Sequence, residues 1–214
     1  KESFDKRYPG YVEKMSAESF FMPNKDVYIH VYFPSHVEGV FYDVVFGFNK
    51  GSKSTDIDLN TWQFKAFSNC PSFIYTYAYP YMKKGLFLNT FKRKYSSKVL
   101  ANAAKTKNPG NVLSYDISIY CAMKYIIEKK YLNTENAKKI QKGSNMNTLM
   151  DHVQDADKIQ KDRKEQIAAE KSENENSEPS AKEVTKTKDI KSTKGATTVA
   201  SAKSVKTTKT VKTI

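Results

Sequence analysis

Eight basic side chains between Lys83 and Lys107 are the part of the sequence best suited to contact a charged partner. No Asp or Glu lies in this range, although the whole chain carries 23 acidic residues against 36 basic ones. The eight are Lys83, Lys84, Lys92, Arg93, Lys94, Lys98, Lys105 and Lys107. Cations without acidic neighbours bind phosphates largely independently of base sequence, because each contact releases counterions from the nucleic acid. The segment therefore predicts a nucleic-acid interface, with neighbouring tyrosines available to stack on unpaired bases.

A second set of cations lies in the C-terminal part of the chain, which is a low-complexity sequence of Lys, Thr, Ser and Val. Four of its lysines recur at intervals of three: Lys203, Lys206, Lys209 and Lys212. Such a composition buries too little apolar surface to offset the entropy lost on folding, so we predict a disordered basic tail over 172–214. A mobile arm can follow a phosphate backbone without a fixed geometry, and we assign these lysines to the same contact.

Two other interpretations of the lysines stay open. An AT-rich coding bias produces Lys, Asn, Ile and Tyr throughout a chain, in which case the cations are a solvated face and the tyrosines are core. The net charge of +13 also suits an anionic membrane surface. No apolar run reaches the roughly 18 residues of a membrane span, so we predict no membrane-spanning segment.

Catalytic motifs are missing from the sequence, which contains no GxGxxG, GxxxxGK[ST], HExxH or GxSxG pattern. The three histidines are His30, His36 and His152. We interpret His30 as a polar residue on the face of a sheet and His152 as lying beyond the folded domain. Asp56 and Asp58 suit a carboxylate pair, but beside Lys53 they are typical of a solvated strand end. The sequence predicts a protein that is not an enzyme and has no metal site and no cofactor.

The first half of the predicted domain contains strands. "DVYIHVYF" (26–33) alternates apolar and polar residues with period two, and "VFYDVVFGF" (40–48) is β-branched and aromatic on both faces, as in a central strand. A third strand runs through Ile57 and Leu59 to Phe67, with an irregularity near Asn60 where the apolar parity shifts. Short turns between these strands predict an antiparallel sheet of about three strands over 26–68.

The second half, 70–142, has helical signals. Segment 71–84 has an early Pro and a final Gly typical of a helix, kinked at Pro80, although its tyrosines also alternate as in a strand. Short helices are predicted over 96–105 and 133–143, and a longer one over 114–132 that Ser114 caps. Its buried residues are expected to be Ile119, Tyr120, Met123, Ile126 and Ile127.

These elements predict an α+β domain over 26–143, preceded by an N-terminal arm (1–25). It is followed by a solvated helix or linker (144–171), because this part has charges of both signs and few apolar residues. Cys70 and Cys121 lack CxxC or ligand spacing, so we predict two small buried side chains and not a disulfide or a reactive thiol.

The chain resembles one group of proteins in the segments "FSNCPSFIYTYAYPYMKKG" and "KNPGNVLSYDISIYCAMKYIIEKKYL", together with the Lys-rich tail. It looks like small virion or accessory structural proteins of tailed bacteriophages with AT-rich genomes, over residues 26–132. The resemblance implies a structural component of a virion or of the host cytoplasm, in contact with nucleic acid or with other virion proteins. The alternative is a protein–protein assembly module for a capsid, portal or tail partner, whose surface is the aromatic sheet and whose lysines serve solubility.

Overall fold

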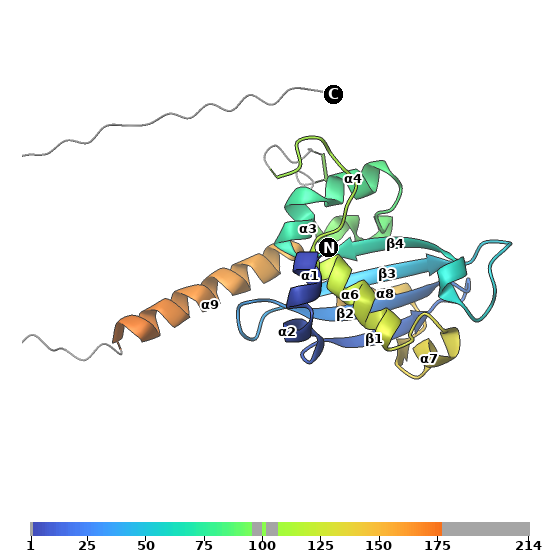
Figure 1. Cartoon of the computed structure of the whole chain (residues 1–214), viewed down its shortest axis with the longest axis horizontal. Helices are drawn as coiled ribbons and strands as arrows, with labels where there is room; N and C mark the ends of the chain where they lie inside the picture. The colour runs from blue at the N-terminus through green and yellow to red at the C-terminus, as the bar shows by residue number, and fades with distance from the viewer. Residues whose placement is uncertain (1, 96–99, 102–106, 177–214) are drawn as a thin grey trace, which may run out of the picture. The chain divides into compact units, whose positions relative to one another are not determined.

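A five-stranded mixed sheet lies at the centre of the residues that the computed structural model describes, 2–95, 100–101 and 107–176 (Figure 1). These residues fall in one compact unit that spans 1–177. The strand order is β4-β3-β2-β1-β5. The strands are β1 (Ser16–Phe21), β2 (Val27–Pro34), β3 (Phe41–Asn49), β4 (Gln63–Ser68) and β5 (Gln141–Gly143). Neighbours from β1 to β4 are antiparallel, whereas β5 runs parallel to β1.

The strand register places four polar side chains on one face of this sheet. Glu18 pairs with His30 across β1 and β2, and Tyr32 pairs with Asp43 across β2 and β3. Residues directly opposite each other, and residues two apart along a strand, point to the same side. All four therefore lie on the same face, and the intervening positions of β2, such as Ile29 and Val31, supply a fully buried apolar core on the other.

Helices cover both faces. They are α1 (Glu2–Arg7), α2 (Pro9–Val12), α3 (Pro71–Thr76), α4 (Ala78–Lys83), α6 (Ile117–Glu128), α7 (Thr134–Lys138), α8 (Met146–His152) and α9 (Ala156–Asn176), with 3₁₀ turns η1 (Leu59–Thr61) and η2 (Asn89–Lys94). Helix α6 crosses the apolar face, where Ser118 bonds Ser68 of β4 (Figure 1). On the polar face, the His152 ring of α8 packs edge-on against Phe20, and Phe91 of η2 stacks on Phe67.

The predicted α+β class and the two strands at 26–33 and 40–48 are confirmed, but the sheet is larger than predicted. The third strand begins only at Gln63, because the irregularity near Asn60 is the 3₁₀ turn η1. Residues 1–25 contain α1, α2 and the strand β1, so they belong to the fold and do not form a separate arm. Strand β5 was not predicted, since its three residues have no apolar alternation.

The helices predicted over 71–84 and 114–132 are confirmed in type and corrected in detail, whereas the one predicted over 133–143 ends at Lys138 and its last three residues form β5. Segment 71–84 is helical and breaks into α3 and α4 at Tyr77, three residues before Pro80, whose missing N–H cannot bond residue 76. Asp116, and not Ser114, caps α6 through a hydrogen bond from the Ile119 N–H. Ile127, expected in the core, is 54% exposed.

The segment 144–171 is part of the fold and not only a solvated helix or linker. Leu149 and Met150 of α8 and Ile159 of α9 are buried, which ties both helices to the core. Cys70 and Cys121 are free and buried, as predicted. The tail predicted over 172–214 begins later than expected, because 172–176 are still part of α9. The rest of it and the predicted helix at 96–105 lie outside the described residues, apart from the helical residues 100–101. No helix in the described part of the chain is long and apolar enough to cross a bilayer.

Candidate functional site

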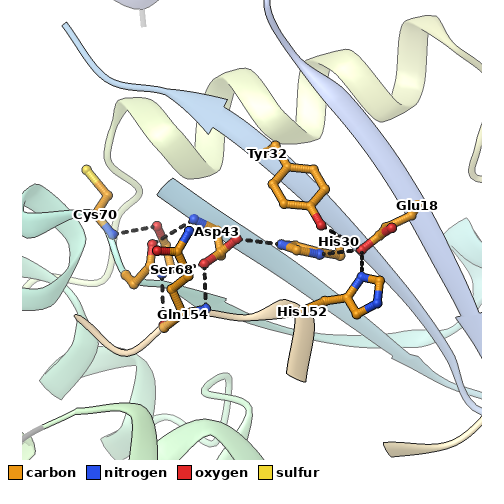
Figure 2. A network of polar contacts seen from close by, with 9 residues as sticks. Glu18, His30, Tyr32, Asp43, Ser68, Cys70, His152 and Gln154 are labelled. Carbon is orange, nitrogen blue, oxygen red and sulfur yellow. Dashed lines mark hydrogen bonds and ion pairs between the residues drawn. The ribbon is translucent and has the colours of Figure 1, made fainter. Parts of the chain in front are cut away.

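A buried chain of polar groups runs across β1, β2 and β3 and ends on the segment after α8 (Figure 2). His30 lies at its centre and has no exposed surface. Its Nε2 is 2.8 Å from Asp43 Oδ1, and its Nδ1 is 3.1 Å from Glu18 Oε1. An imidazole with a carboxylate on each side is not a passive residue on the face of a sheet, which corrects the sequence-based interpretation of His30.

Asp43 is held in place from three directions. Its Oδ2 accepts hydrogen bonds from the Asn69 Nδ2 at 2.7 Å and from the Gln154 N–H at 2.9 Å, while its own N–H donates to Asn69 Oδ1. Because a carboxylate oxygen accepts and a ring N–H donates, we assign the hydrogen of this contact to the His30 Nε2, which donates it to Asp43 Oδ1. This assignment leaves the His30 Nδ1 facing Glu18.

Three groups converge on a single oxygen of Glu18. Its Oε1 lies 3.1 Å from the His30 Nδ1, 2.5 Å from the His152 Nδ1 and 2.9 Å from the Tyr32 Oη, which donates to it. Figure 2 shows the three side chains reaching this oxygen, His30 and Tyr32 from β2 and His152 from the end of α8. His152 therefore belongs to the folded unit, in contrast to the prediction that it lies beyond the domain.

The electrostatics follow from burial and from these contacts. Burial acts to raise the pKa of Glu18, but its hydrogen-bond contacts with His30, His152 and Tyr32 outweigh it and lower the pKa to about 2. Burial acts to lower the pKa of His30, but Asp43 and Glu18 together outweigh it and raise the pKa. Burial and the contact with Glu18 raise the pKa of Tyr32. The network thus keeps Glu18 an anion at neutral pH.

The donor set at this point is one that binds metal ions. The Glu18, His30 and His152 ligand atoms all lie within 4.8 Å of one another. Glu18 and His152 retain 13% and 24% of their side-chain exposure, so the cluster is open to solvent on one side. The sequence does not reveal this cluster, because Glu18 and His152 are 134 positions apart. Its only signal in the sequence is that histidine is rare in this chain.

The predicted nucleic-acid residues on α4 and η2 lie elsewhere, on either side of a segment that contacts the edge strand β4. Segment 86–88 runs along β4, with backbone hydrogen bonds between Ala66 and both Leu86 and Leu88. This segment connects α4 to η2. The exposed members of the predicted set are Lys83, Lys84, Lys92, Arg93 and Lys107. Lys94 is half-buried and forms an ion pair at 3.3 Å with Asp155.

The structure therefore corrects one part of the predicted basic segment. Lys94 has an acidic partner that is distant in sequence, so it is not an uncompensated cation. Lys98, Lys105 and the tail residues Lys203, Lys206, Lys209 and Lys212 lie outside the described residues. The carboxylates Asp56 and Asp58 form no pair: Asp56 is exposed and contacts Lys50, and Asp58 caps η1.

Comparison with known proteins adds no name to either site. No protein family, curated protein or solved structure matches this chain.

Proposed function

We propose that this protein is a non-enzymatic structural or binding protein that contacts nucleic acid through the cations beside β4, in the phage virion or accessory role that its sequence resembles. The observation that carries the proposal is a segment without acids: between Asp58 and Asp116 the chain contains no Asp or Glu. This segment supplies β4, α3, α4 and η2. One edge of the sheet is therefore bordered by elements that bring only positive formal charge.

The exposure of the cations supports phosphate contact. Lys92 and Arg93 project from η2, and Lys83 and Lys84 lie at the C-terminal end of α4, all exposed. The half-buried Lys94 beside them already has its counter-ion in Asp155. Exposed cations in a segment without acidic residues attract phosphates from a distance and hold them without a fixed base sequence.

Aromatic side chains beside these cations support contact with single strands. Tyr75 of α3 is 50% exposed. The Lys83 Nζ lies 5.4 Å from the centre of the Tyr79 ring, a cation–π arrangement. A base stacked on an aromatic ring contributes about 1–3 kcal/mol for any base type, so this surface suits unpaired nucleic acid with little sequence preference.

The test is fluorescence anisotropy with labelled single-stranded and double-stranded DNA over a range of salt concentrations. The variant K92Q/R93Q removes two exposed cations and leaves the Lys94–Asp155 pair intact. If each cation meets one phosphate, the plot of log affinity against log salt becomes shallower by about two units for duplex DNA. Adding K94Q to this variant is expected to change the slope further by less than one unit, because Lys94 is already paired with Asp155.

A matched control removes the same charge from the opposite edge of the sheet. Lys138 of α7 and Lys142 of β5 are both exposed, and β5 is the far edge strand. K138Q/K142Q is expected to leave the salt slope nearly unchanged. The proposal fails if the wild type shows no binding at about 50 mM salt, or if the two double variants lose affinity equally.

A second candidate function is protein assembly, and one apolar groove favours it. The central strands β2 and β3 are buried along most of their length, so they offer little of the aromatic docking surface that the sequence suggested. A groove of about 400 Å³ between α6 and β4 is instead lined by Phe64, Tyr115 and Ile127, which are all exposed large side chains. A protein that binds no DNA but self-associates, and loses that association on I127E substitution, would favour assembly.

A further inference from the structure

Glu18, His30 and His152 have the composition of a transition-metal site. Two imidazole nitrogens and one carboxylate oxygen are the protein ligands of many zinc centres that keep a fourth position for water. Hard ions such as Mg²⁺ and Ca²⁺ prefer shells made of oxygen atoms. The three ligand atoms come from β1, β2 and the end of α8, and they lie within 4.8 Å of one another.

The surroundings of His30 support this interpretation independently of the three ligands. A metal-bound histidine usually donates its other ring N–H to a carboxylate, which fixes the ring and its tautomer. His30 does so through its Nε2, 2.8 Å from Asp43 Oδ1. Asp43 is in turn fixed by Asn69 and the Gln154 N–H, so the ring cannot rotate away. The Nδ1 is thereby held toward Glu18 Oε1.

The two distances to Glu18 can be compared with those of a tetrahedral ion, while the two histidine ligand atoms lie within 4.8 Å of each other. Ligands at about 2.1 Å from zinc are spaced about 3.4 Å apart around a tetrahedron. The His30 Nδ1 to Glu18 Oε1 distance of 3.1 Å is already close to this value. The His152 Nδ1 to Glu18 Oε1 distance of 2.5 Å requires His152 to withdraw by about 1 Å. His152 is the last residue of α8 and is partly exposed, so it is the ligand most free to move.

We propose that Glu18, His30 and His152 bind one Zn²⁺ or a similar divalent transition-metal ion, with Asp43 orienting His30 and a water molecule or the Tyr32 hydroxyl facing the fourth position. The ion enters from the side where Glu18 and His152 are exposed. Its effect is structural, because it joins α8 to strands β1 and β2, which are far away in the sequence. This site is separate from the cations beside β4 and does not depend on nucleic-acid binding.

The chain has few other histidines or cysteines that could bind Zn²⁺, which simplifies the test. The whole sequence holds three histidines and two cysteines. Both cysteines are buried. His36 contacts Arg163 and lies outside the cluster, so it serves as the matched control.

The experiment titrates ZnCl₂ into the full-length protein, after removal of metal with a chelator, by isothermal calorimetry. We expect one Zn²⁺ per chain, no comparable binding of Mg²⁺, and a rise in melting temperature of about 5–10 °C at a hundredfold excess over Kd. Co²⁺ in place of Zn²⁺ should give the intense visible absorption of a tetrahedral site. H152A and E18Q should weaken binding at least tenfold, whereas H36A should bind as the wild type does.

Three results would overturn the proposal. These are a wild type that binds no Zn²⁺ at micromolar concentration, H152A and E18Q variants that bind as tightly as the wild type, and a loss of binding in H36A. Circular dichroism decides whether each variant is folded. If E18Q does not fold, H152A alone decides the question, because His152 is partly exposed and its removal leaves Glu18 in contact with His30 and Tyr32.

Discussion

The cap of helix α6 offers a prediction in which burial and charge oppose each other. Asp116 is almost fully buried. Its Oδ1 accepts hydrogen bonds from the Ile119 N–H at 3.1 Å and from the Ser118 hydroxyl at 3.0 Å. Burial raises the pKa of Asp116 above its usual 3.8, although these hydrogen bonds act against the rise. The variants D116A and D116N separate two contributions to the free energy of unfolding: the stabilisation by the helix cap and the destabilisation by the buried charge.

The magnitudes follow from the contacts. D116A removes the cap, which costs about 1 kcal/mol, and leaves buried donors without an acceptor, which costs about 1–3 kcal/mol. We expect a total loss of about 2–4 kcal/mol in the free energy of unfolding. D116N keeps an oxygen that accepts the Ile119 N–H and replaces an ionisable group with a neutral one, so its loss is expected to be about 1 kcal/mol at low pH.

The pH dependence has a definite sign. Because the pKa of Asp116 is raised in the folded state, this carboxyl holds its proton in the folded protein at pH values above 3.8 where the unfolded chain loses it. The wild type therefore has its full advantage in free energy of unfolding over D116N below this pH. It loses this advantage as the pH rises through the folded-state pKa. Between the unfolded-state and folded-state pKa values the loss approaches about 1.4 kcal/mol for each pH unit. The difference in free energy of unfolding by which D116N falls below the wild type should therefore become smaller over that range.

The assay is urea unfolding at several pH values from about 3.5 to about 7, followed by the fluorescence of Trp62, the single tryptophan. The control is N133A, which removes the cap of α7, where Asn133 accepts from the Glu135 N–H, and changes no ionisable group. Its deficit of about 1 kcal/mol should not vary with pH beyond the effect of neighbouring charges. A deficit of D116N that grows as the pH rises would refute the reasoning, because it would mean that the folded state stabilises the ionised carboxylate.

Three further predictions concern stability and are measured by thermal or urea unfolding. A Cβ at Gly47 would lie 2.7 Å from both the Leu88 and Tyr28 side chains, so G47A should cost about 1–3 kcal/mol, whereas G10A, with open space around it, should be neutral or stabilising. I159A should cost about 2–5 kcal/mol because Ile159 is fully buried, and the exposed Lys164 on the same helix should tolerate alanine; equal effects would show that α9 does not pack on the domain. Deleting 177–214 should leave the melting temperature nearly unchanged, and a clear drop would show that the tail stabilises the fold.

The sequence alone determined those features that depend on local patterns. Alternation at 26–33 defined β2 because a strand repeats every two residues, and the start and stop signals around 71–84 defined a helix that breaks near Pro80. The basic segment was also a local feature, and the exposure of Lys92 and Arg93 agrees with it. The small strand β5 has no such pattern, because its pairing with β1 is set by the chain around it.

The tertiary structure alone decided which distant residues meet. Lys94 pairs with Asp155, and Glu18 meets His152, across separations that no periodicity reports. The register of β1 on β2 places Glu18 opposite His30. A polar residue at one position of a strand is solvated or buried according to what packs over that face, and here α8 covers it. A hydrophobic pattern depends on residues that are neighbours along the chain, so the sequence shows it. A site of converging side chains depends on residues that are neighbours in space, and only tertiary packing brings these together.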